Sequence, residues 1–212
     1  MERISTILHY WFGNAEKTTF PSDHRQWIWF SADPSLDLEV KTQFEEDLFH
    51  AIQGHYAHWE NTHRGILALI ILWDQFSRHI YRNKPMAFAQ DDQALKLCLL
   101  GIDRAYDHRL SLMERIFFYF PLMHAENIEM QILSVRAYQM LAMIAFPETK
   151  SLFERFLESA IHAHDQIRQF GRFPDRNEIL GRASTKSELI FLNNQKNTPL
   201  SPFHWNDYTP SN

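Results

Sequence analysis

Turn-forming residues are scarce in this sequence, because its 212 residues include only six glycines and nine prolines. An all-β fold of this length needs many tight turns, and tight turns depend on those two residues. Apolar residues instead recur at helical spacing, as in Leu36, Val40, Phe44, Leu48 and Ile52, which step by four. The sequence therefore predicts an all-α protein.

Capping residues and helix breakers place the expected helices. Asp33 or Ser35 offers a start for a helix near residue 34, Gly54 offers its end, and Gly171 stands where a left-handed C-terminal cap is expected. Short breaks between helices favour antiparallel neighbours, so the pattern predicts an antiparallel helix-pair solenoid or bundle of about seven to nine helices. The expected helices cover residues 34–54, 62–81, 87–105, 111–124, 126–146 and 148–170.

The content of large apolar residues predicts one hydrophobic core. Hydrophobic residues make up 45% of the chain, and they include 17 phenylalanines and six tryptophans. We expect residues 1–192 to form a single helical domain. Residues 193–212 contain Pro199, Pro202 and Pro210 and are expected to form an irregular C-terminal tail.

Charge and cysteine content argue against several classes of protein. The net charge of -5 repels nucleic acid on average. The longest apolar run covers residues 65–73, whereas a membrane span needs about 20 residues, so no membrane partner is expected. The start of the sequence lacks the features of a secretory signal, and Cys98 is the only cysteine, so we expect a cytoplasmic protein without a disulfide.

Asp74 and Arg78 lie four residues apart and in line with the apolar residues Leu67 and Ile70, so both charges fall on the apolar face of a helix. One interpretation is an intrahelical ion pair that satisfies itself. The other is that Arg78 and Arg82 point into a cleft and bind an anion.

A second polar group lies among aromatic residues at 114–131. Arg115 and Tyr119 share one helical stripe, and Pro121 is expected to kink or end that helix before His124 and Glu126. His124 and Glu126 could form an acid/base pair or part of a metal site, or they could be a hydrogen-bonded structural element. The common nucleotide, metalloprotease, hydrolase and redox motifs do not occur, and we predict no cofactor and no metal.

Three arginines, Arg172, Arg176 and Arg182, lie close together beside Gly171 and Gly181. Guanidinium groups match the oxygens of carboxylate and phosphate, so this cluster indicates anion recognition. The competing interpretation is that the arginines fix the turn to carbonyls and acids elsewhere in the fold.

Taken together, these segments resemble the bacterial domain of unknown function 924 family, whose proteins are similar to tetratricopeptide-type helical solenoids. The resemblance spans nearly the whole chain and implies a fold but no activity. Departures from the family pattern stand at Ser77, His79, Asp175, and at Ala163 with His164. The resemblance is carried by Trp11, Phe12, Gly13, Trp29, Phe30, Asp33, Pro34, the run from Leu67 to Phe76, Arg78, Tyr81, Arg82, Ala87, Phe88, Ala89, Asp91, Arg115, Tyr119, Pro121, His124, Glu126, Gln131, the run from Phe170 to Pro174, Arg176, Asn177, Leu180, Gly181 and Arg182.

Three functional hypotheses follow. The first is a binding module whose concave, arginine-rich cleft holds an acidic peptide or a small anionic ligand. The second is an enzyme acting on a phosphate- or carboxylate-bearing small molecule, with His124 and either Glu126 or Asp74 as acid and base. The third is a purely structural polar network. The predicted ligand-binding residues are Arg78, Tyr81, Arg82, Arg115, Tyr119, Arg172, Arg176, Asn177 and Arg182, and the oligomeric state is left open.

Overall fold

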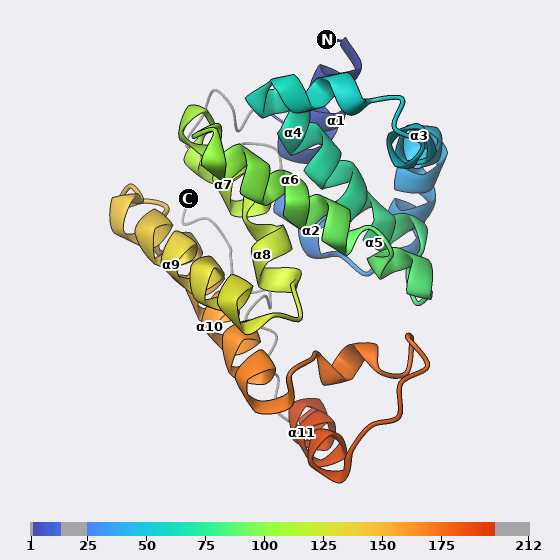
Figure 1. Ribbon diagram of the computed structural model, residues 1–212, viewed down its shortest axis with the longest axis vertical. Helices are drawn as coiled ribbons and strands as arrows, with labels where there is room; N and C mark the ends of the chain where they lie inside the picture. The colour runs from blue at the N-terminus through green and yellow to red at the C-terminus, as the bar shows by residue number, and fades with distance from the viewer. Residues whose placement is uncertain (1, 14–24, 198–212) are drawn as a thin grey trace, which may run out of the picture.

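A computed structural model describes residues 2–13 and 25–197, and these residues form helices and connecting turns without a β-strand (Figure 1). The predicted all-α class is therefore confirmed. Two continuous helical runs are subdivided, because α4, a π-helical turn and α5 follow one another directly and only Tyr119 separates α7 from α8. Counted in this way, the described residues form nine helical rods, which agrees with the predicted range.

The α-helices are α1 (Glu2–Phe12), α2 (Arg25–Phe30), α3 (Pro34–Ile52), α4 (His63–Ile70), α5 (Ser77–Ile80), α6 (Asp91–Asp103), α7 (Leu112–Phe118), α8 (Phe120–His124), α9 (Ile128–Ile144), α10 (Lys150–Phe170) and α11 (Lys186–Asn197). The π-helical turn is η2 (Ile71–Phe76), and the 3-10 turns are η1 (Ala57–Asn61), η3 (Pro85–Phe88), η4 (Asp107–Arg109) and η5 (Pro174–Arg176).

Local capping chemistry sets several of these boundaries. The Asp33 carboxylate accepts a hydrogen bond from the backbone N–H of Ser35 at 2.8 Å, and Pro34 occupies the first turn of α3. Gly171 ends α10 with a φ of 71°, a conformation that favours glycine. Both signals were predicted from the sequence, and both are confirmed.

Two local predictions need correction. The break before His124 falls at Tyr119, and Pro121 lies in the first turn of α8, where its missing N–H costs no hydrogen bond. The expected irregular tail begins too early, since α11 continues to Asn197 after a reciprocal cap between Thr185 and Glu188. The rest of that tail, residues 198–212, lies outside the described residues.

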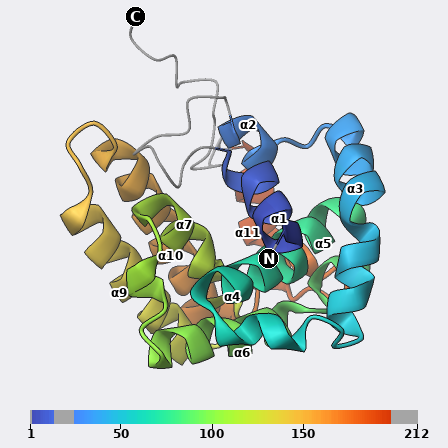
Figure 2. The same cartoon turned by 90° about the horizontal axis from the view of Figure 1, so that it is seen from above.

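The helices pack around one connected cluster of buried apolar side chains. The rod formed by α4, η2 and α5 contacts α1, α3 and α6, while α9 and α10 lie side by side as an antiparallel pair (Figures 1 and 2). Phe117 sits in the core and contacts the rings of Trp11, Trp29 and Phe156. A repeating tetratricopeptide-like solenoid stays a prediction. None of the described helices combines the length and apolar character needed to cross a membrane.

Candidate functional site

Asp74 is a fully buried acid in the π-helical turn of the central rod. π-helical turns are rare and occur often at functional sites. The Asp74 Oδ1 lies 2.7 Å from Nδ1 of His124, and the Gln75 amide donates to Oδ2. Arg78, one turn further along, approaches Oδ1 at 3.4 Å. Burial opposes ionisation of Asp74, but Arg78 and His124 outweigh it and hold the pKa of this carboxyl well below its usual range.

His124 is the last residue of α8, and its side chain is 20% exposed. Burial lowers the pKa of this imidazole despite the opposing effect of Asp74, so the neutral form is favoured near pH 7. A neutral ring next to an ionised carboxylate donates through Nδ1–H, which leaves a lone pair on Nε2. No described residue forms a hydrogen bond with that Nε2. His124 is therefore an oriented imidazole whose second nitrogen has no hydrogen-bond partner among the described residues.

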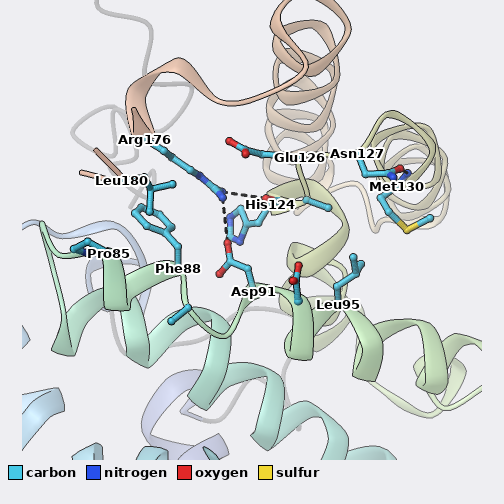
Figure 3. Close-up of a pocket in the computed structure, with 13 residues that line it drawn as sticks. Pro85, Phe88, Asp91, Leu95, His124, Glu126, Asn127, Met130, Arg176 and Leu180 are labelled. Atoms are coloured by element: carbon cyan, nitrogen blue, oxygen red, sulfur yellow. Dashed lines mark hydrogen bonds and ion pairs between the residues drawn. The ribbon is translucent and has the colours of Figure 1, made fainter. Parts of the chain in front are cut away.

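Two arginines from distant parts of the chain converge on Asp91, at the start of α6. Arg78 donates to both Asp91 oxygens at 3.0 Å. Arg176 donates to Oδ2 of the same carboxylate at 3.1 Å (Figure 3). Arg176 also donates to the His124 carbonyl at 3.1 Å, and its guanidinium lies 4.8 Å from the ring of Phe88 and 4.6 Å from that of Phe173. These contacts join η3, α6, α8 and η5 around His124.

Two cavities adjoin this cluster, with volumes of about 550 Å³ and about 470 Å³. Phe88, His124 and Arg176 line both. We call them the larger cavity, which is drawn in Figure 3, and the smaller cavity. The larger is completed by Pro85, Ala89, Asp91, Asp92, Leu95, Ala125, Glu126, Asn127, Met130 and Leu180, and the smaller by Arg78, Met123, His162, Ala163, Gln166, Phe173, Asp175 and Gln195.

Glu126 also faces the larger cavity but is occupied by other partners. Its carboxylate accepts hydrogen bonds from Arg182 at 2.6 and 2.9 Å and from the backbone N–H of Phe173 at 2.8 Å. Although burial opposes ionisation, these bonds lower the pKa of Glu126. Of the two acids predicted as partners of His124, it is Asp74 that forms a hydrogen bond with the imidazole.

The arginines predicted to share one positively charged hollow fall instead into separate groups. A charge that leaves water needs a partner, and the fold supplies carboxylates within the chain. Only Arg78 and Arg176 line the cavities beside His124. Of the others, Arg82 binds Asp37, Arg115 contacts Tyr119, Arg172 binds Glu188, Arg182 binds Glu126, Asn177 donates to Ser184, and Tyr81 lines a groove on α3.

Several residues of the cluster were absent from the predicted set. Asp91 and Phe88 belong to the segment at 87–91, which carries part of the family resemblance. No local sequence pattern identifies them as partners of Arg176, which is 85 residues from Asp91. His162 belongs to a helix with no distinctive motif. Within the described residues, no three His, Cys, Asp or Glu side chains gather in a way that could hold a metal ion.

Fold and site together define an all-α protein with a buried aspartate–histidine pair beside two arginines that share one carboxylate. Residues 7–196 match the family model for bacterial proteins of unknown function known as DUF924, so the chain belongs to this family. It is also similar to the solved structure of a protein of unknown function from Agrobacterium tumefaciens. That likeness has a TM-score of 0.75 and 29% identity, covering 91% of this chain and 98% of the other. No curated protein matches.

Proposed function

We propose that the protein is an enzyme that uses His124 as a general base on a small molecule bearing a carboxylate or phosphate group. The observation that carries the proposal is the 2.7 Å contact between His124 Nδ1 and the buried Asp74, made by an imidazole that also lines two cavities. A carboxylate at one ring nitrogen fixes the tautomer, orients the ring and stabilises the imidazolium that forms when the other nitrogen takes a proton.

The surroundings of His124 suit this role. Its lowered pKa keeps the base form populated near neutral pH, and Asp74 is available to stabilise the cation after proton transfer. Arg78 and Arg176 line the cavities and provide positive charge for an anionic substrate. Cavities of this size suit small molecules. The free, buried Cys98 fits the expected cytoplasmic location.

A binding module without chemistry is the second candidate. The observation that favours it is that Arg78 and Arg176 hold the carboxylate of Asp91 between them, in the way that two guanidinium groups would hold a ligand carboxylate. An external anion would compete with Asp91 for them. The cavity volumes favour a small anion over an acidic peptide as the occupant.

The test is turnover of a panel of phosphate esters, carboxylate esters and hydroxy acids by the full-length chain. For any substrate turned over, His124→Gln should lower kcat/KM by about 100-fold or more, the usual contribution of a general base. His108→Gln is the matched control, because that histidine is 70% exposed in η4, away from the cavities, and should leave the rate unchanged.

Undiminished turnover in folded His124→Gln, checked by circular dichroism, would remove His124 as the base. If the whole panel is inert but inorganic phosphate or small carboxylates raise the melting temperature, the binding module takes the place of the enzyme.

A further inference from the structure

The two cavities share three wall residues but differ in charge. Asp91, Asp92 and Glu126 line the larger cavity, with Arg176 as its only arginine, whereas the smaller cavity has Arg78 and Arg176 against Asp175 alone. Asp91, which pairs with both arginines, lines the larger cavity but not the smaller. An anion therefore meets a more favourable potential in the smaller cavity.

His162, on α10, gives the smaller cavity a second imidazole. Its Nε2 lies 3.2 Å from Nε2 of Gln195. A side-chain amide nitrogen can only donate, so His162 Nε2 accepts this hydrogen bond and the ring proton resides on Nδ1. No described residue forms a hydrogen bond with that Nδ1. The smaller cavity is thus lined by two imidazoles that each carry one ring nitrogen without a described hydrogen-bond partner: the acceptor Nε2 of His124 and the donor Nδ1–H of His162.

The arginines retain donors as well. Arg78 and Arg176 form their bonds to Asp74, Asp91 and His124 through the terminal guanidinium nitrogens. The Nε–H groups of both arginines form no hydrogen bond with a described residue, and neither is among the fully buried, unpartnered atoms. Each arginine can therefore donate once more without releasing Asp91.

We propose that the ligand is a small hydroxy acid bound in the smaller cavity, with its hydroxyl group at His124 and its acidic group at His162 and Arg78. This assignment rests on the proposed function. The hydroxyl hydrogen bonds to Nε2 of His124, and the acidic oxygens accept from Nδ1–H of His162 and Nε–H of Arg78. In the base step the O–H bond breaks, its electron pair stays on the oxygen, and the proton forms the Nε2–H bond of an imidazolium.

Two methionines report separately on the cavities, because Met123 lines only the smaller and Met130 only the larger. Full-length protein with ¹³C-labelled methionine methyl groups would be titrated with glycolate. The matched probe is acetate, which lacks the hydroxyl group. Met123→Leu and Met130→Leu assign the two methyl signals.

We expect glycolate to shift the Met123 signal while the Met130 signal stays in place. Acetate should bind about tenfold more weakly, as expected for the loss of one hydrogen bond worth about 1.4 kcal/mol. His162→Gln should weaken glycolate binding by a similar factor, and His108→Gln should not change it.

A shift confined to Met130, equal affinities for glycolate and acetate, or the absence of any methyl shift would each overturn the assignment. None of these results bears on the loss of turnover expected for His124→Gln, so the hydroxy-acid assignment and the proposed function can fail separately.

Discussion

Asp74 keeps its negative charge in a site with no exposure to solvent. It does so because Gln75, Arg78 and His124 surround its two oxygens. Removing one member of a buried ionic group leaves the others uncompensated, which is more costly than the loss of an exposed pair. Asp74 thus both supports the fold and orients His124.

Asp74→Asn should lower the free energy of unfolding by about 2–4 kcal/mol, since Arg78 loses a buried counterion and the neutral His124 loses the carboxylate that accepts its Nδ1–H. Urea denaturation at pH 7 would measure the change. Asp165→Asn is the control, because this half-exposed carboxylate contacts Arg168 at the surface. The substitution should change the free energy of unfolding by less than about 1 kcal/mol. Equal, small effects for both variants would contradict the account of Asp74.

The lowered pKa of His124 predicts how stability depends on pH. Below the unfolded pKa of about 6.5 the unfolded chain takes up a proton before the folded chain does, so stability falls as pH decreases from 7 to 5. Burial lowers the pKa of His79 as well, which adds to the same trend. Each histidine can contribute a slope of at most about 1.4 kcal/mol per pH unit.

Stability should therefore decrease less between pH 7 and pH 5 in His124→Gln than in the unaltered protein, as measured by urea midpoints at pH 7, 6 and 5. His108→Gln should leave the decrease unchanged. A slope in His124→Gln equal to that of the unaltered protein would show that His124 titrates normally.

Among the elements, the segment from Gly171 to Thr185 matters most to the cavities, because it contributes Arg176 and Leu180 to their walls. It contains η5 and is tied to the connection between α8 and α9 through the pair between Arg182 and Glu126. In Figure 1 it leaves the end of α10 and returns to α11 as a long connection. Its position therefore depends on side-chain contacts more than on helix packing.

Arg182→Met should lower the free energy of unfolding by about 1–2 kcal/mol, because Glu126 then loses a bidentate, partly buried ion pair. Amide exchange should accelerate across residues 172–185 more than in α9. Arg168→Met is the control, because it removes a guanidinium that is 70% exposed. It should change neither the free energy of unfolding nor the amide exchange of residues 172–185. Unchanged exchange in Arg182→Met would mean that other contacts hold the segment.

At the scale of the whole molecule, local and distant interactions differ in how well the sequence predicts them. The helix boundaries at Asp33 and Gly171 depend on residues within one turn, so capping rules could place them. The contact between Asp74 and Arg78 follows from helical spacing. The pairing of Arg176 with Asp91 and of His124 with Asp74 depends on how the rods pack, which no local pattern encodes.

The partners of the arginines were not predictable from the sequence for the same reason, because they depend on how the helices pack. The sequence predicted that the guanidinium groups bind carboxylate or phosphate oxygens, but it could not show whether those oxygens belong to a ligand or to a carboxylate of the same chain. Packing brings Asp37 to Arg82 and Glu188 to Arg172, so those two arginines stabilise the fold. The proposed function rests on a smaller group, which consists of Asp74, Arg78, His124 and Arg176.

The state of the His124 ring tests the account most directly. Long-range ¹H–¹⁵N correlation spectra of the ¹⁵N-labelled protein, recorded from pH 5 to 8 and assigned with His124→Gln, report both its tautomer and its pKa. We predict a neutral ring at pH 7 with the proton on Nδ1 and a pKa below the ordinary 6.5. A ring protonated on Nε2, or one that titrates at or above 6.5, would contradict the account.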